Sequence, residues 1–161
     1  MIVVVMGVSG AGKTTIGTAL AGKSGWAFVD ADDFHPPANV ARMAAGTPLT
    51  DEDRWPWLEK MNAEMRVREE RGESLVLACS ALKEAYRARL MHGLAAARLV
   101  YLEGGFELIR GRAQARRNHF MPAALLRSQF DTLEPPEGAL RIDAGLAVHV
   151  AVAQILLALA P

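Results

Sequence analysis

The sequence predicts an α/β fold with three layers, in which a sheet of about five parallel strands is covered by helices on both faces. Short β-branched or apolar runs alternate with longer helical patterns, which is typical of βαβ units. The length of 161 residues suits one domain, because a division would leave pieces too small to bury good cores. We therefore expect residues 1–161 to form a single domain.

The expected strands are short and mostly apolar. Residues 2–6, with the sequence Ile-Val-Val-Val-Met, carry no polar side chain, as in a strand that is buried on both faces. Residues 74–79 form a second run of this kind. Further strands are expected over residues 26–30, 98–102 and 139–143.

The expected helices end at glycines or begin at prolines. Gly22 and Gly25 end the first helix, Gly46 ends the second and Gly72 ends the third. Helices are expected over residues 14–23, 36–45, 51–71, 83–92, 106–117, 122–132 and 146–160.

Composition excludes several classes of protein. Apolar residues make up 51% of the chain and charged residues 22%, which is typical of a globular rather than a disordered protein. Eighteen Lys and Arg residues balance eighteen Asp and Glu residues, so we do not expect nucleic-acid binding as the main activity. The single cysteine, Cys79, cannot form an intrachain disulfide and fits a reducing compartment.

The apolar segments predict neither export nor a membrane span. The run at residues 1–6 is too short for the apolar core of a signal peptide and follows no basic residue. The apolar stretch over residues 146–160 is shorter than the roughly 20 residues that cross a bilayer. We expect a soluble, cytoplasmic protein that does not bind membranes.

Residues 7–14, Gly-Val-Ser-Gly-Ala-Gly-Lys-Thr, match the phosphate-binding pattern G-x-x-x-x-G-K-[ST] in full. An expected strand precedes the pattern and an expected helix follows it, so backbone N–H groups and a helix N-terminus can surround an anion. Lys13 is expected to bridge the β- and γ-phosphates, and the Thr14 hydroxyl to ligate Mg²⁺. The residues expected to bind a nucleoside triphosphate are Gly7, Ser9, Gly10, Ala11, Gly12, Lys13, Thr14 and Thr15.

The rest of the chain favours a small-molecule kinase among the proteins that carry this loop. A GTPase would need D-x-x-G and N-K-x-D motifs, and neither occurs in the sequence. A motor ATPase is usually far longer. In a small kinase the protein must hold a hydroxyl in line with the γ-phosphate and neutralise the charge there.

Carboxylates follow the second expected strand, where ligands of open α/β sheets bind. Because the third expected strand ends in Cys79-Ser80 without an aspartate, Asp30 or Asp32 must hold Mg²⁺ through water, and we expect Asp30 to do so. Asp32 is expected to orient the acceptor hydroxyl and take its proton, with a turn or helix cap as the alternative role. Capping is the expected role of Asp33, and His35 either binds substrate or is structural.

Several blocks of the sequence together resemble the gluconate kinase family. They are residues 7–14, D-x-D-x-x-H-P at 30–36, L-T-D-E-D-R-W-P-W at 49–57, C-S-A-L-K-x-x-Y-R at 79–87, A-R-x-x-H-F at 115–120 and Q-F-x-T-L-E at 129–134. The resemblance covers residues 3–136, and it departs from the usual pattern at Ala31 and Asn118, where Gly is common.

This resemblance implies a nucleoside-monophosphate-kinase-like P-loop fold with a helical lid over residues 106–122. It also implies transfer of the γ-phosphate of ATP to the 6-hydroxyl of D-gluconate, with Mg²⁺, by a homodimer. The alternatives are a kinase of another small polyol acid such as shikimate, or a regulator that binds ATP without catalysis.

An acceptor with a carboxylate and several hydroxyls needs cations and hydrogen-bonding groups in its pocket. We expect Arg54, Ser80, Lys83 and Arg87 to bind it, with Lys83 and Arg87 on one helix face at i, i+4. A solvated surface pair is the alternative, and which of Arg54 and Arg87 holds the carboxylate stays open. The indoles at positions 55 and 57 are expected to pack against the core.

Arg112 and Arg116 share a helix face at i, i+4 in the expected lid. By analogy with kinases of this fold, we expect both to contact the charge that develops at the γ-phosphate, and Arg112 also to bind the nucleotide. Arg110 and Arg117 are expected to face solvent or the lid hinge.

Overall fold

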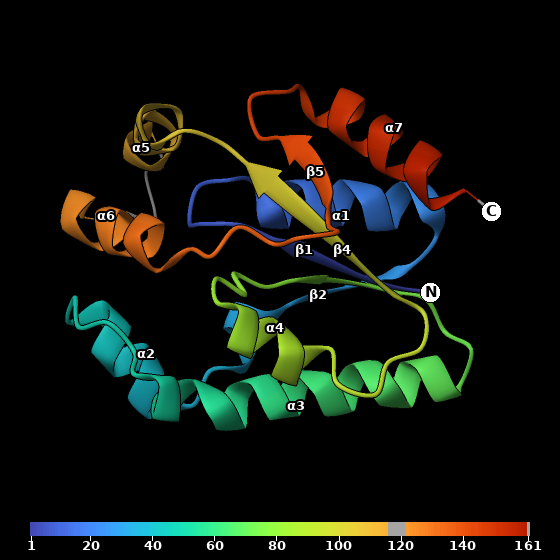
Figure 1. Ribbon diagram of the computed structural model, residues 1–161, viewed down its shortest axis with the longest axis horizontal. Helices are drawn as coiled ribbons and strands as arrows, with labels where there is room; N and C mark the ends of the chain where they lie inside the picture. The colour runs from blue at the N-terminus through green and yellow to red at the C-terminus, as the bar shows by residue number, and fades with distance from the viewer. Residues whose placement is uncertain (116–121, 161) are drawn as a thin grey trace.

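A five-stranded sheet forms the centre of the computed structural model, which describes residues 1–115 and 122–160 (Figure 1). The strand order is β2-β3-β1-β4-β5, and all four pairings between neighbouring strands are parallel. The strands are β1 (Ile2–Met6), β2 (Ala27–Asp30), β3 (Leu75–Ala78), β4 (Ala97–Glu103) and β5 (Leu140–Asp143). Their positions agree with the predicted strands to within a residue or so at each end.

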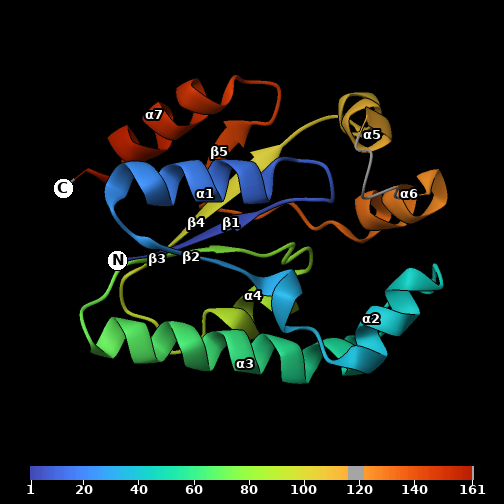
Figure 2. The same ribbon diagram turned by 180° about the vertical axis from the view of Figure 1, so that it is seen from behind.

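Helices cover both faces of the sheet, so the predicted three-layer α/β/α class is confirmed. Figures 1 and 2 show α1 and α7 on one face, and α3 with α4 on the other. The helices are α1 (Lys13–Ser24), the 3₁₀ helix η1 (Ala31–Phe34), α2 (Pro37–Ala44), α3 (Asp51–Glu70), α4 (Glu84–Leu90), α5 (Phe106–Ala115), α6 (Ala123–Thr132) and α7 (Val148–Leu159).

The central strand β1 divides the hydrophobic core into two parts, because successive side chains of a strand point to opposite faces. Val3 and Val5 pack into the core under α1 and α7. Ile2, Val4 and Met6 pack into the core over α3 and α4. All five side chains are completely buried, and the strand therefore fixes the position of the loop that follows it.

The η1 helix is the main element that the sequence pattern did not predict. Asp30 begins it as the N-cap, and its side chain accepts a hydrogen bond from the Asp32 backbone N–H. The helix turns the chain sharply at the carboxyl end of β2. As a result, Asp32 and His35 lie close to the end of the sheet instead of continuing the strand.

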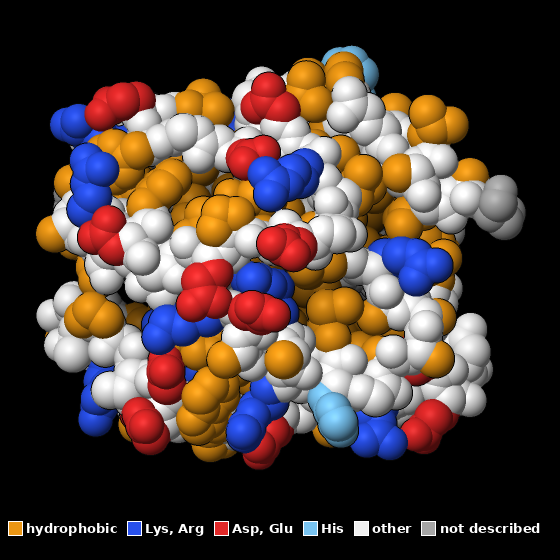
Figure 3. Space-filling view, in the orientation of Figure 1, with side chains coloured by type: hydrophobic (Ala, Val, Ile, Leu, Met, Phe, Trp, Pro, Cys, Tyr) orange, Lys and Arg blue, Asp and Glu red, His pale blue; other side chains and the backbone are white. Residues whose placement is uncertain are grey.

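The surface of the protein carries both acidic and basic side chains. Among the described helices, α7 is the most apolar. Acidic and basic side chains are interspersed over the face in Figure 3, as the balanced composition suggests. On α7, Val152 and Ile155 face the core while Leu157 is 80% exposed. None of the helices within residues 1–115 and 122–160 has the length and apolar character of a membrane span.

Two glycines of α1 give a matched test of packing between this helix and the sheet. A Cβ atom at Gly17 would lie 2.7 Å from Cε2 of Phe28, whereas a Cβ atom at Gly22 would meet nothing within 4 Å. We expect Gly17→Ala to lower the free energy of unfolding by about 1–3 kcal/mol through overpacking. We expect Gly22→Ala to raise it by up to about 1 kcal/mol, because alanine favours the helix. Urea unfolding of both variants measures this, and equal effects would contradict the packing described.

Candidate active site

The loop between β1 and α1 has the backbone geometry of an anion cradle. Gly10 and Gly12 adopt φ angles of 84° and 99°, a left-handed region that side chains rarely tolerate. A Cβ atom at Gly10 would also lie 3.1 Å from Cγ2 of Ile109, so the position is closed to larger residues. Gly12 is the N-cap of α1, which places the positive end of the helix dipole at the loop. The Lys13 ammonium group donates to the carbonyl oxygen of Val8 at 3.1 Å.

Thr14 and Asp30 come together beside this loop. The Thr14 hydroxyl donates to Asp30 Oδ2 at 2.7 Å, and Asp30 Oδ1 accepts from the Asp32 backbone N–H at 3.0 Å. Mg²⁺ in such sites takes one or two protein oxygens and completes its shell with water and substrate phosphates. Thr14 and Asp30 therefore form a donor set that fits Mg²⁺. The described residues contain no cluster of three or more His, Cys, Asp or Glu side chains that could hold a metal ion instead.

Two cavities meet the phosphate loop, one on each side of β1. The β5-side cavity, of about 310 Å³, is mostly lined by apolar residues. Its lining includes Gly10, Gly12, Thr15, Arg112, Ala144 and Leu146. The β3-side cavity, of about 290 Å³, has a more polar lining. Its lining includes Ser9, Lys13, Asp32, His35, Arg54, Ser80 and Lys83.

Asp32 lies in the β3-side cavity, close to the loop lysine. The protein around the cavity desolvates the carboxylate and raises its pKa, Lys13 opposes this rise, and nearby Asp30 adds to it. The side chain is nevertheless 72% exposed, so water screens these effects. This carboxylate faces the cavity in a form that can accept a proton.

His35 is held beside Asp32 by packing and by a buried asparagine. Its ring stacks on the Trp57 indole with centroids 4.1 Å apart, and Trp57 Nε1 donates to the carbonyl oxygen of Ala31 at 2.6 Å. The Asn39 amide nitrogen lies 3.5 Å from Nδ1 of His35 and donates there in the tautomer that carries the ring proton on Nε2. That Nε2 atom lies 3.8 Å from Asp32 Oδ1. Burial lowers the pKa of His35 against the opposing effect of Asp32, so the ring is neutral at pH 7.

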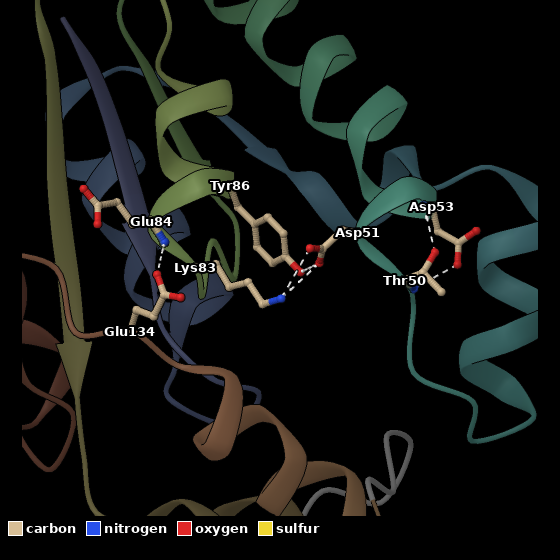
Figure 4. A network of polar contacts seen from close by, with 7 residues as sticks. All are labelled: Thr50, Asp51, Asp53, Lys83, Glu84, Tyr86 and Glu134. Atoms are coloured by element: carbon tan, nitrogen blue, oxygen red, sulfur yellow. Dashed lines mark hydrogen bonds and ion pairs between the residues drawn. The ribbon is translucent and has the colours of Figure 1, made fainter.

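A group of charged and aromatic side chains lines part of the β3-side cavity. Figure 4 shows the contacts among them. The Asp51 carboxylate accepts hydrogen bonds from the Tyr86 hydroxyl and from Lys83 Nζ, which lies 3.1 Å from Oδ1. These two donors, Tyr86 first, lower the pKa of Asp51. The reciprocal hydrogen bonds between Thr50 and Asp53 fix the first turn of α3, which carries Asp51.

Arg54 extends over the same group and keeps an unused donor. Its guanidinium lies 5.2 Å from the centroid of the Tyr86 ring. Its Nε atom is buried and has no hydrogen-bond partner among the described residues. Leaving such a donor unsatisfied costs about 1–3 kcal/mol, so Arg54 is held in the wall of the cavity at an energetic cost.

Arg87 lies elsewhere, and its geometry does not support the prediction that it binds the acceptor. Its side chain is buried, and Nη1 donates to the carbonyl oxygens of Ala81 and Leu82 at 3.0 Å each. Ala81 has a φ angle of 44°, a strained value for a residue with a side chain. The hydrogen bonds from Arg87 stabilise this turn. The two side chains of the predicted i, i+4 pair have different partners, because Lys83, the N-cap of α4, donates to Asp51 while Arg87 donates to backbone carbonyl groups.

The predicted lid residues are described only in part. Arg112 lies on α5, lines the β5-side cavity, and donates from Nη1 to the carbonyl oxygen of Ala144. Arg110 makes a surface ion pair with Glu107 at 3.7 Å. Arg116, Arg117 and Asn118 lie outside the described residues.

Sequence reasoning missed four residues of the β3-side site. Asp51, Tyr86 and Gln129 stand inside the blocks that carry the family resemblance, at 49–57, 79–87 and 129–134, so the sequence holds a signal for them. Asn39 and Gln129 contact His35 and Ser9 from other elements. Only the folded chain brings Gln129 next to a residue 120 positions away.

Comparison with known proteins places the chain in a family. A family model described as "AAA domain" matches residues 2–136. The chain is 46% identical to a probable gluconokinase of Xenopus tropicalis, over 96% of this chain and 91% of that protein. It is 48% identical to a gluconokinase of Gluconobacter oxydans, over 83% of this chain and 75% of that protein. The chain belongs to the gluconokinase family.

Solved structures agree with this membership of the gluconokinase family. The crystal structure of a gluconokinase from Sinorhizobium meliloti superposes with a TM-score of 0.89 at 39% identity, covering 98% of this chain and 90% of that one. A shikimate kinase from Acinetobacter baumannii superposes with a TM-score of 0.61 at 21% identity, covering 98% of this chain and 91% of that one. This second likeness shows a shared P-loop kinase fold and carries no information about the substrate.

The position of Arg87 generates a stability prediction. We expect Arg87→Met to lower the free energy of unfolding by about 1.5–3 kcal/mol, because two buried carbonyl groups lose a charged donor. The matched control is Arg98→Met on β4, an exposed position where the change should stay within about 0.5 kcal/mol. Chemical unfolding measures both. An Arg87→Met variant as stable as Arg98→Met would contradict the structural role.

Proposed function

We propose that this chain transfers the γ-phosphate of ATP to the 6-hydroxyl of D-gluconate, giving 6-phospho-D-gluconate and ADP. Family membership supports the reaction class and the acid. The observation that carries the proposal is the pair of cavities that share the phosphate loop, one largely apolar and one rich in charged groups. Such an arrangement lets a nucleotide and an acidic polyol approach the same loop from opposite sides, as direct transfer requires.

The nucleotide occupies the phosphate loop and the β5-side cavity in this proposal. Backbone N–H groups of residues 7–14 and the ammonium group of Lys13 hold the phosphates. The apolar lining of the cavity, with Arg112 at its edge, takes the nucleoside. Thr14 and Asp30 would hold Mg²⁺, Asp30 through water, and the ion when bound neutralises charge on the phosphates.

The acid occupies the β3-side cavity. Asp32 accepts a hydrogen bond from the attacking hydroxyl and takes its proton as the bond to phosphorus forms. His35 and Ser80 contribute hydrogen bonds to the sugar chain. Because the ring of His35 is neutral, it does not offset the negative charge of Asp32. Lys13 is part of the phosphate loop, and its positive charge also acts on the Asp32 carboxylate.

Arg54, and not Arg87, holds the carboxylate of the acid in this proposal. Arg54 lines the cavity with its guanidinium over the Tyr86 ring, whereas Arg87 is occupied by two backbone carbonyl groups. Lys83 neutralises Asp51, which would otherwise repel an acidic substrate, and Tyr86 donates a hydrogen bond to the same carboxylate. This leaves a net positive charge for the carboxylate.

The remaining predictions concern closure and assembly. Arg112 and Arg116 of a lid over residues 106–122 are proposed to approach the transferred phosphoryl group when the lid closes. The homodimer implied by the family resemblance and the cytoplasmic location stay predictions.

An ADP-release assay with a panel of sugar acids tests the proposed reaction. We expect saturable ADP production with gluconate, and little with shikimate. Nucleotide binding without turnover on any acid would overturn the proposal and favour a regulatory ATP-binding protein.

The role of Asp32 predicts a loss of rate without a loss of nucleotide binding. We expect Asp32→Asn to lower kcat by at least about 10²-fold, the usual contribution of a general base, while ADP affinity stays near the wild-type value. The rate of the wild type should fall as the pH drops through the pKa of Asp32, which lies above that of an ordinary aspartate. A stopped assay across the pH range measures both, and a variant that retains most of its rate would remove Asp32 from this role.

The role of Arg54 predicts an effect on the acid alone. We expect Arg54→Met to raise the KM for gluconate by about tenfold or more, through loss of one charged hydrogen bond, with the KM for ATP unchanged. Arg71→Met, at the exposed C-cap of α3, is the matched control and should behave as wild type. An unchanged KM for gluconate in Arg54→Met would contradict the assignment.

A further inference from the structure

Gln129 of α6 makes a direct contact with the phosphate loop. Its Oε1 atom accepts a hydrogen bond of 2.7 Å from the backbone N–H of Ser9. Because a backbone N–H can only donate, the oxygen of the carboxamide must face the loop. The NH₂ group is thereby turned away from Ser9, and it has no acceptor within the described part of the chain.

The helix that carries Gln129 forms a wall of the β3-side cavity. Four of its residues, spaced as one helical face, line that cavity: Leu125, Ser128, Gln129 and Thr132. Ser9 and Lys13 of the phosphate loop line the same cavity. Gln129 therefore lies at the boundary between the loop and the space proposed for the acid.

The carboxyl end of α6 is tied to the acceptor side of the site. The backbone N–H of Glu134 donates to the carbonyl oxygen of Leu82 at 2.9 Å. The carboxylate of Glu134 accepts from the backbone N–H of Glu84 at 2.7 Å (Figure 4). These contacts fix the helix next to the loop after β3, and a donor on a fixed helix is already oriented before any ligand arrives.

We propose that Gln129 is a catalytic residue of the phosphoryl transfer, an inference that rests on the proposed function of the two cavities. Its carbonyl oxygen holds the Ser9 amide, and its NH₂ group donates a hydrogen bond to an oxygen of the γ-phosphoryl group. During transfer, charge is spread over the three equatorial oxygens of this group, and a fixed donor stabilises it. The same carboxamide thus connects the loop to the reacting phosphoryl group.

The variant Gln129→Glu distinguishes donation to the γ-phosphoryl group from a purely structural hydrogen bond to the phosphate loop. A carboxylate has the same shape and still accepts from the Ser9 N–H, but it has no donor and places a negative charge beside the γ-phosphate. We expect kcat to fall by about 10²- to 10³-fold. We also expect ATP affinity to fall by about tenfold or more relative to ADP affinity, because ADP lacks the phosphate that the charge repels. Gln154→Glu on α7, an exposed position, is the control for the chemical change.

A second variant, Gln129→Leu, fixes the interpretation. This variant loses both the acceptor and the donor of the side chain. If Gln129 only held the loop in place, Gln129→Leu would therefore be more impaired than Gln129→Glu. We expect the opposite order, with Gln129→Glu at least as impaired. The proposal would be overturned if Gln129→Glu kept a kcat within about threefold of the wild-type value and an unchanged ratio of ATP to ADP affinity. The affinity ratio is measured without any acid, so it tests Gln129 even if wild type phosphorylates no sugar acid.

Discussion

The site depends on a backbone constraint at the end of β1. Five completely buried residues fix the strand between two cores, and the chain then turns through glycines in left-handed conformations into the N-terminus of α1. This geometry concentrates backbone donors at one point, where an anion is the ligand that fits. The parallel order of the sheet then places one cavity on each side of that point.

Most of the charged side chains at the β3-side cavity are already bonded to other groups of the protein. Lys83 and Tyr86 are engaged with Asp51, and Arg87 is engaged with the turn at Ala81. Arg54 alone of these cations combines a place in the cavity wall with a buried donor that has no partner in the described chain. An arginine near a site is therefore no evidence of ligand binding until its own hydrogen bonds are accounted for.

The fold was largely predictable because its evidence is local. Apolar runs such as residues 2–6, glycine stops and the phosphate-loop pattern act over short stretches, and the sheet followed from their alternation. The roles of Lys83 and Arg87 were not predictable from i, i+4 spacing, because Lys83 donates to Asp51 of α3 whereas Arg87 donates to the carbonyl groups of the turn before α4. Gln129 stands in the block at 129–134, but its contact with Ser9 could not be predicted, since it exists only after the sheet and α6 have formed.

The most direct test of this account is a crystal structure with a non-hydrolysable ATP analogue and gluconate bound together. The account predicts the triphosphate along residues 7–14, the base in the β5-side cavity near Arg112, and the acid in the β3-side cavity between Asp32 and Arg54. The 6-hydroxyl should face the terminal phosphate across the loop. Gluconate bound outside the β3-side cavity, or both ligands on the same side of β1, would contradict it.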